Sequence, residues 1–234
     1  MRKPRRLPAE AFAPFEYVPP GFVTGWGDGP PSELPAGPFP RIDWSQLFGN
    51  ANPVEIEVGF GKGLFLVNEA MARPNVNFLG IEIIRKYQRY ASGRIASRKL
   101  PNCKTCWADA KRLLRDYVPQ NTVQTVHVFF PDPWWKTKHK RRTLFTLDFA
   151  QLVLSVLQPA GILHFVTDVA DYFEMVIGVI ATIPTFAILP PPTASAVVHD
   201  MDYLTNFERK FRKEGRAIYR ARYEKTCVND RGRV

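Results

Sequence analysis

The stretch Phe129-Phe130-Pro131-Asp132-Pro133-Trp134-Trp135 gives the clearest indication of the fold, and it ends an apolar run that begins at Val123. Continuous Val and Phe runs are typical of parallel strands that are buried on both faces. Because proline cannot continue a central strand, the strand should end at Pro131. Asp132 is therefore expected at the carboxyl edge of a parallel sheet, where open α/β sheets bind their ligands.

A dense cationic run follows the two tryptophans. It contains Lys136, Lys138, Lys140, Arg141 and Arg142. A capped strand followed by a solvated basic helix would also explain this run. The adjacent indoles favour nucleic acid, because aromatic faces between cations suit an unstacked base and its phosphates.

The composition of the whole chain also favours a polyanionic partner. The 234 residues carry 32 Lys and Arg against 22 acids, a net charge of +10, with a sequence pI near 9.7. Nucleic acid is the first candidate. The most apolar late stretch, 175–189, is interrupted by Gly178 and Pro184 and is too short to cross a bilayer, so no membrane association is expected.

The cysteines indicate a reducing compartment, and we expect a cytoplasmic protein. There are three of them, an odd number without the spacing of a disulfide framework. Cys103-Lys-Thr-Cys106 has the spacing of half a zinc site, but no second pair follows. We therefore expect no metal, and cysteines that flank or enter a buried strand.

The chain is expected to comprise an arm, residues 1–43, and one domain, residues 44–234. Residues 1–53 contain 11 of the 21 prolines and the run Gly25-Trp-Gly-Asp-Gly29, so no helical or strand period survives there. We expect a partly disordered arm with a basic tip, whose aromatic residues Phe12, Phe15, Tyr17 and Trp26 dock on the domain. A mobile tail explains the composition as well.

From residue 54 onward, strands should alternate with helices. Such alternation predicts a mostly parallel sheet with helices on both faces. A short helix at 43–48 should lead into the domain. The expected strands are 54–58, 78–83, 103–107, 123–130 and 162–167, and the expected helices are 64–72, 84–98, 110–117, 143–157 and 169–182.

A glycine-rich turn connects the first strand to the first helix of the domain. Gly59, Gly61 and Gly63 would let a ligand approach the backbone closely at the helix N-terminus. The spacing differs from the full dinucleotide fingerprint, and a tight turn without a ligand is the alternative. Glu82 follows Gly63 by 19 residues, at the ribose-binding position of a nucleotide-binding sheet. With Glu57, Asp109 and Asp132 it should line one crevice.

These motifs together resemble one known family. Ile56-Glu-Val-Gly-Phe-Gly-Lys-Gly63, Leu79-Gly-Ile-Glu82, Ala108-Asp109, Phe129-Phe-Pro-Asp-Pro-Trp134 and Thr167-Asp168 look like the bacterial tRNA (guanine-N7)-methyltransferases. The resemblance covers about residues 44–225. It implies a seven-stranded Rossmann-like methyltransferase fold. It also implies methyl transfer from S-adenosylmethionine to the variable-loop guanine of tRNA, at position 46, without an obligatory protein partner.

The resemblance also assigns residues by position. Glu57, Glu82, Asp109 and Asp132 would contact the methyl donor, and Asp132 would also be catalytic. The turn with Gly59, Gly61 and Gly63 is expected to contact the same donor, because its backbone lets a ligand approach closely. Lys136, Asp168, Thr205, Asn206, Phe207 and Glu208 would contact the substrate. From their charge rather than from the resemblance, Lys138, Lys140, Arg141 and Arg142 are expected to contact the RNA backbone. Asn206 departs from the family, which usually has lysine there, so one contact is either missing or supplied by Arg209 or Lys210.

Three other functions share some of these features. An amino-methyltransferase acting on adenine commonly has a Pro-Pro-aromatic segment after its acid or asparagine, whereas one proline and two tryptophans follow Asp132 here. A nicotinamide dehydrogenase would share the sheet, but the glycine spacing disfavours it. A noncatalytic RNA-binding module would explain the charge but not the aligned acids.

Overall fold

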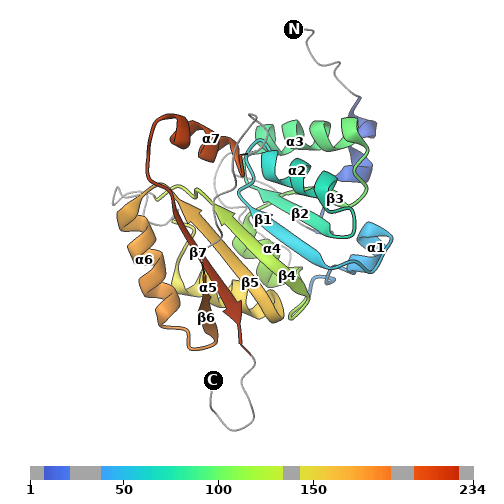
Figure 1. Cartoon of the computed structure of the whole chain (residues 1–234). Helices are drawn as coiled ribbons and strands as arrows, with labels where there is room; N and C mark the ends of the chain where they lie inside the picture. The colour runs from blue at the N-terminus through green and yellow to red at the C-terminus, as the bar shows by residue number, and fades with distance from the viewer. Residues whose placement is uncertain (1–7, 22–37, 134–142, 191–202, 227–234) are drawn as a thin grey trace.

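The computed structural model of the protein describes residues 8–21, 38–133, 143–190 and 203–226. Within these ranges, seven strands form one sheet in the order β3-β2-β1-β4-β5-β7-β6 (Figure 1). The predicted seven-stranded α/β sheet is thereby confirmed. The strands are β1 (Val54–Val58), β2 (Asn77–Glu82), β3 (Cys103–Trp107), β4 (Val123–Phe129), β5 (Leu157–Thr167), β6 (Phe186–Leu189) and β7 (Tyr219–Lys225). The α-helices are α1 (Trp44–Phe48), α2 (Leu64–Ala72), α3 (Arg85–Arg98), α4 (Ala110–Asp116), α5 (Leu147–Val156), α6 (Ala170–Ala181) and α7 (Asn206–Lys213).

The carboxyl ends of five strands meet at one edge of the sheet. β1 pairs in parallel with β2 and β4, β2 pairs in parallel with β3, and β4 pairs in parallel with β5. β7 runs antiparallel to both β5 and β6. The chain order reverses between β1 and β4, and ligands of such sheets bind in the crevice outside the strand ends at this point.

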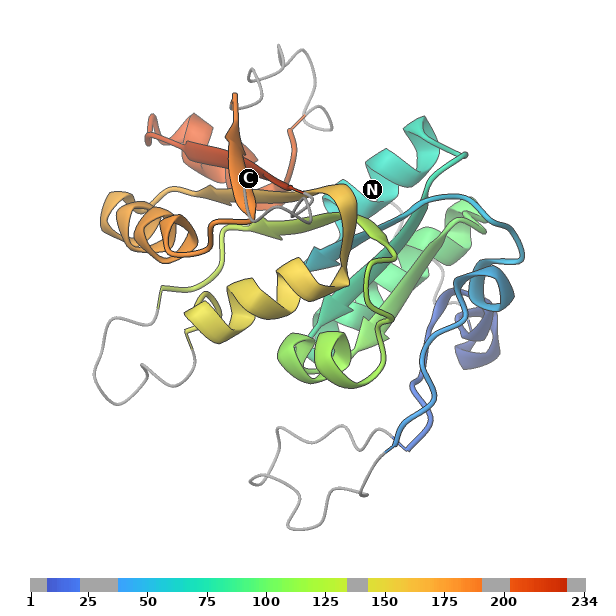
Figure 2. The ribbon, with the colours of Figure 1, turned by 90° about the horizontal axis from the view of Figure 1, so that it is seen from below.

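The two faces of the sheet differ in polarity. The face under α4, α5 and α6 is apolar, and Ile56, Val126 and Leu163 are fully buried there. Phe149 of α5 and Tyr172 of α6 fill the same core. Figure 2 shows this helical layer from below, with α4 packed against α5 and α5 against α6. This face supplies apolar burial, the main favourable term in folding.

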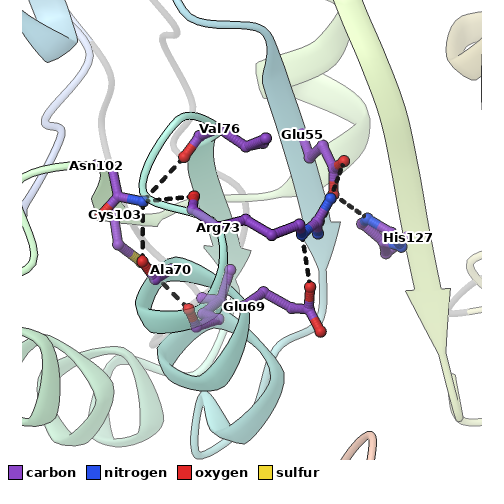
Figure 3. A network of polar contacts seen from close by, with 9 residues as sticks. Glu55, Glu69, Ala70, Arg73, Val76, Asn102, Cys103 and His127 are labelled. Atoms are coloured by element: carbon purple, nitrogen blue, oxygen red, sulfur yellow. Dashed lines mark hydrogen bonds and ion pairs between the residues drawn. The ribbon is translucent and has the colours of Figure 1, made fainter.

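The opposite face, under α2 and α3, contains a buried ion-pair network. Arg73 donates to both oxygens of Glu55 at 2.7 and 2.9 Å, and His127 Nε2 lies 2.9 Å from Glu55 Oε2 (Figure 3). Burial raises the pKa of Glu55, but hydrogen bonds from His127 and Arg73 outweigh burial and lower this pKa to about 2. Burial, followed by repulsion from His127, lowers the pKa of His164 to about 3. The network ties α2 to β1 and β4.

The predicted starts of one helix and of the strand that follows it were wrong. The expected helix 143–157 is the shorter α5, which begins at Leu147 with Thr146 as its N-cap. The expected strand 162–167 is the longer β5, which already begins at Leu157. Between Leu157 and Ile162 the pairing with β4 shifts register, so the Pro-Ala-Gly segment that was expected to separate the two elements forms an irregularity within the strand. The expected short helix at 43–48 is confirmed as α1, with Asp43 as its N-cap.

Part of the N-terminal arm docks along β3, the edge strand. Tyr17 N–H donates to Thr105 O at 2.8 Å, and Lys104 Nζ donates to Pro14 O at 2.6 Å. Phe15 packs against the core under α3, and the ring of Phe12 lies against Gly93 of α3. The predicted docking of these aromatic residues is confirmed; Trp26 lies outside the described residues. The arm thereby covers part of an otherwise unpaired strand edge.

The cysteines of β3 belong to different cores. Cys106 packs on the face of α4, and Cys103 packs under α2, where its thiol lies 3.9 Å from Leu66 O. Both are fully buried, and burial raises the pKa of each thiol. Because residues three apart on a strand point to opposite faces, the pair does not converge on one metal ion.

In the part of the chain that the structure describes, none of the helices has the length and apolar character needed to cross a bilayer.

Candidate active site

The glycine turn after β1 has a backbone that only glycine adopts readily. Gly59, Gly61 and Gly63 have φ of 76, 54 and 65°, all in the left-handed region. Gly59 N–H donates to Ile81 O at 2.8 Å, which holds the turn against β2. A β-carbon built on Gly59 or Gly61 would meet no atom within 4 Å, so the turn faces open space. A ligand can therefore approach its backbone directly.

Glu82 connects this turn to the start of α3. One carboxylate oxygen accepts a hydrogen bond from Gly61 N–H at 2.8 Å, and the other accepts from Ile84 N–H at 2.9 Å. Burial raises the pKa of Glu82, although these N–H groups oppose the shift. The carboxylate therefore braces the turn and the helix start at once, at the position where a ribose was predicted to bind.

Glu57 has a different environment, although it lies on the same face of the sheet. Glu57 is only 2% exposed, and its Oε2 has no hydrogen-bond partner within the described ranges. Burial, followed by the charges of Glu82 and Glu69, raises its pKa well above the usual value. A buried acid without a partner is costly. A cationic or hydrogen-donating ligand group at the crevice would satisfy it.

The side chain of Asp109 already forms a hydrogen bond within the protein. It is the N-cap of α4, and its Oδ1 accepts a hydrogen bond from Arg112 N–H at 2.9 Å. The residue is half-buried at the end of β3, beside Glu82, whose carbonyl accepts from Ala108 N–H at 3.1 Å. Its predicted contact with the methyl donor stays a prediction, and the structure gives it a capping role in addition.

The chain turns sharply at the end of β4 and leaves Asp132 exposed. Phe130, just before Pro131, has φ 50°, a left-handed conformation that costs a bulky residue about 1–3 kcal/mol. It is held there because its N–H donates to Val166 O at 2.7 Å and its ring packs on Phe211 of α7, with centroids 5.5 Å apart. This turn leaves Asp132 at the end of β4, near enough to Glu82 for its charge to contribute to the raised pKa of Glu82.

Asp168, at the end of β5, is held by an ion pair. Its partner is Arg216, in the segment between α7 and β7. The Arg216 guanidinium also lies over the Phe211 ring, 4.3 Å from its centroid. Asp168 is largely buried, and the pair joins β5 to the end of α7.

In the predicted substrate segment 205–208, two residues are buried and two are accessible. Thr205 caps α7 by accepting from Glu208 N–H at 3.0 Å, and Glu208 accepts from Leu204 N–H at 2.8 Å and pairs with Arg220 of β7. Both are buried and serve the helix. Asn206 and Phe207 are accessible, and Phe207 is 49% exposed. We expect these two to be the ones available to a substrate.

Other predicted residues lie outside the described ranges. These are Lys136, Lys138, Lys140, Arg141 and Arg142. Sequence reasoning missed Phe130 and Arg216. The Phe-Pro-Asp-Pro order signals a turn but not a positive φ, and Arg216 is 48 residues from Asp168, so no local pattern links them.

Comparisons with known proteins agree with this geometry. A family described as putative methyltransferase matches residues 51–221. The tRNA (guanine-N(7)-)-methyltransferase of Rhodopirellula baltica is 42% identical over 201 residues, covering 83% of this chain and 73% of that protein. The enzyme of that name from Vibrio cholerae serotype O1 is 34% identical over 187 residues, covering 80% of this chain and 78% of that protein.

Solved structures show the same fold at low identity. The 16S rRNA methyltransferase KamB superposes with a TM-score of 0.59 at 15% identity, covering 79% of this chain and 93% of that one. An antibiotic-related methyltransferase superposes with a TM-score of 0.55 at 18% identity, covering 76% and 90%. The fold is thus Rossmann-like, as in methyltransferases, and the sequence matches above decide the family. The chain belongs to the tRNA (guanine-N(7)-)-methyltransferase family.

Proposed function

We propose that this protein transfers a methyl group from S-adenosylmethionine to N7 of the guanine at position 46, in the variable loop of tRNA. The observation that carries the proposal is the convergence at one sheet edge of three features: a glycine turn open to a ligand, Glu57, whose Oε2 has no hydrogen-bond partner among the described residues, and the exposed Asp132. Family membership supports the reaction class, and the names of the relatives support tRNA as the substrate.

The residues on β1 and β2 fit the methyl donor. Glu57 offers a buried acid to a cationic group, Glu82 offers carboxylate oxygens to hydroxyl donors, and the turn at Gly59 and Gly61 offers backbone without side chains. Bound S-adenosylmethionine supplies an electrophilic methyl group on a positively charged sulfur. The described residues contain no cluster of metal-ligating side chains, and methyl transfer to a nitrogen lone pair requires none.

The acceptor needs orientation rather than activation. Guanine N7 carries a lone pair and no proton at neutral pH, so Asp132 need not act as a general base, and positioning can supply most of the rate. Methylation gives the purine a positive charge. An exposed carboxylate at Asp132 stabilises that charge, and Asp168 can accept hydrogen bonds from the amino and imino edge of the base.

The cations after Trp135 are proposed to hold the RNA. Lys136 would contact the substrate, and Lys138, Lys140, Arg141 and Arg142 would neutralise phosphates near the target loop. Such contacts release counterions, so RNA affinity should fall steeply with salt. Replacing Lys140, Arg141 and Arg142 together should flatten that dependence, and an unchanged slope would mean that the cluster is only solvated.

One experiment tests the proposal directly. The protein is incubated with labelled S-adenosylmethionine and an unmodified tRNA transcript, and the product is cleaved chemically at N7-methylguanosine. We expect one cleavage site, at the variable-loop guanine, and no label in a transcript with adenine at that position. Label at another guanine would refute the position while retaining the activity, and label on adenine would refute the base.

A further inference from the structure

The solvent face of α3 carries cations that form no ion pair with the described part of the chain. The helix contains no Asp or Glu. Four of its cationic residues, Arg85, Lys86, Arg89 and Arg98, are exposed, and none has a carboxylate within 4.0 Å among the residues that the structure describes. Solvated helix faces usually place acids among their cations, since i,i+4 ion pairs stabilise a helix and like charges at that spacing destabilise it. This face therefore differs from an ordinary surface.

Further cations extend this face toward the methyl-donor turn and α7. Arg94 donates to Lys62 O, within the glycine turn, at 2.9 Å. Burial lowers the pKa of Arg94, and the positive charges of Arg98 and Arg209 lower it further. Arg209 belongs to α7, so α3 and α7 lie close enough for their charges to repel. Figure 1 shows α3 and α7 near the same edge of the sheet. Repulsion of this kind is relieved when a polyanion covers both helices.

Exposed aromatic and apolar groups lie among these cations. Tyr90 is 54% exposed, and Ile84, at the helix start, is exposed as well. The Arg85 guanidinium lies over the Trp107 ring, 4.5 Å from its centroid. Arginine with accessible aromatic rings suits RNA, which offers both phosphates and base or ribose faces. An acidic protein segment would offer the charge without the stacking partners.

We infer that the exposed face of α3 is a docking surface for the phosphate backbone of the substrate RNA, separate from the pocket of the target base. The inference rests on the proposed function, because it takes the polyanion to be the RNA that is methylated. α3 begins shortly after Glu82, whose carboxylate accepts from the N–H of its N-cap, so RNA held there lies next to the methyl-donor site. The surface positions the RNA and takes no part in the chemical step.

The test removes the charges at the first turn of α3. The variant carries Arg85→Gln, Lys86→Gln and Arg89→Gln, and its dissociation constant for an unmodified tRNA transcript is measured by filter binding at several salt concentrations. If the three side chains contact phosphates, the slope of log affinity against log salt should fall by about 2 to 3, since each contact contributes about 0.7 to 0.9. Affinity at physiological salt should fall at least about tenfold, while S-adenosylmethionine affinity, measured by calorimetry, stays the same.

Two controls make the result decisive. Arg85→Lys with Arg89→Lys keeps the charge and should keep the slope. Arg115→Gln removes one cation from α4, where Arg115 already pairs with Asp116, and should leave RNA affinity unchanged. An unchanged slope in the triple variant overturns the inference, and so does an equal loss in the lysine variant, because that would trace the effect to side-chain shape. Since binding is measured without methylation, failure of the proposed reaction would be seen separately.

Discussion

The two halves of the crevice are held in different ways. On β1 and β2, the methyl-donor half is held by contacts between consecutive βα units, chiefly the hydrogen bond from Gly61 N–H to Glu82. On β4, β5 and α7, the acceptor half is held by contacts between distant segments, such as the Asp168–Arg216 pair and the packing of Phe130 on α7. The methyl-donor half should therefore tolerate substitutions in other parts of the protein. The acceptor half should respond to single substitutions in distant segments that contact it.

The largest expected effect belongs to Asp132, which tests whether the acceptor half performs the chemistry. Asp132→Asn keeps the shape and removes the charge that we propose stabilises the methylated purine. The single-turnover rate at saturating tRNA and methyl donor should fall about a hundredfold or more, as is usual when one preorganised electrostatic partner is lost. RNA affinity, set by phosphate contacts elsewhere, should stay nearly the same. A rate within about twofold of the parent would remove Asp132 from the mechanism.

The next effect tests the methyl-donor half. Gly61→Val places a β-branched side chain at φ 54°, where non-glycine residues pay about 1–2 kcal/mol, so the turn should change shape and lose its bond to Glu82. S-adenosylmethionine affinity should fall at least about tenfold by calorimetry, with RNA affinity little changed. Gly178→Ala, in α6, is the control, because that glycine has ordinary φ and open space around it. Unchanged methyl-donor affinity in a folded Gly61→Val protein would count against the pocket.

A smaller effect concerns protons in the methyl-donor half. The pKa of Glu57 is raised well above its usual value by burial and by the charges of Glu82 and Glu69, so the free protein retains this proton at higher pH than an exposed glutamate would. A cationic ligand favours the ionised carboxylate, so binding should release a proton. Affinity should therefore rise with pH until the free carboxyl is ionised, by at most about tenfold per pH unit for one proton.

Calorimetry in two buffers of different ionisation enthalpy measures that proton directly. If Glu57 is the source of the proton, Glu57→Gln should abolish its release. If the source is Glu82, whose pKa is also raised, the Glu57→Gln protein should still release a proton. Binding of the methyl donor to the parent protein without proton release would contradict the assignment of Glu57.

The difference between the halves also explains how far the sequence could predict them. The glycine turn and Glu82 follow from spacing along adjacent βα units, and the structure places them together. The acceptor half depends on pairs such as Asp168 with Arg216, which are 48 residues apart and separated along the chain by α6, β6 and α7. Their contact depends on where β7 enters the sheet, and local periodicity does not encode this. The same limit applies to β5, whose irregular start arises from its pairing with β4.

The smallest expected effect comes from Arg216, which we predict to be a positioning residue for Asp168. Its guanidinium holds the carboxylate while resting on Phe211. Because Arg216 is partly exposed, its ion pair should contribute about 1 kcal/mol or less, so Arg216→Gln should slow single-turnover methylation by at most about fivefold. Arg216→Lys keeps the charge without the planar fork and should restore only part of the rate.

The decisive measurement for Arg216 is a double-mutant cycle with Asp168→Asn. If Arg216 acts through Asp168, adding Arg216→Gln to the Asp168→Asn variant should cost almost nothing, because the group that Arg216 orients is already gone. Thermal unfolding of the four proteins separates a change in stability from a change in the site. Additive losses in rate would show that Arg216 contacts the RNA by itself, and the acceptor half would then be held by α7 packing rather than by this pair.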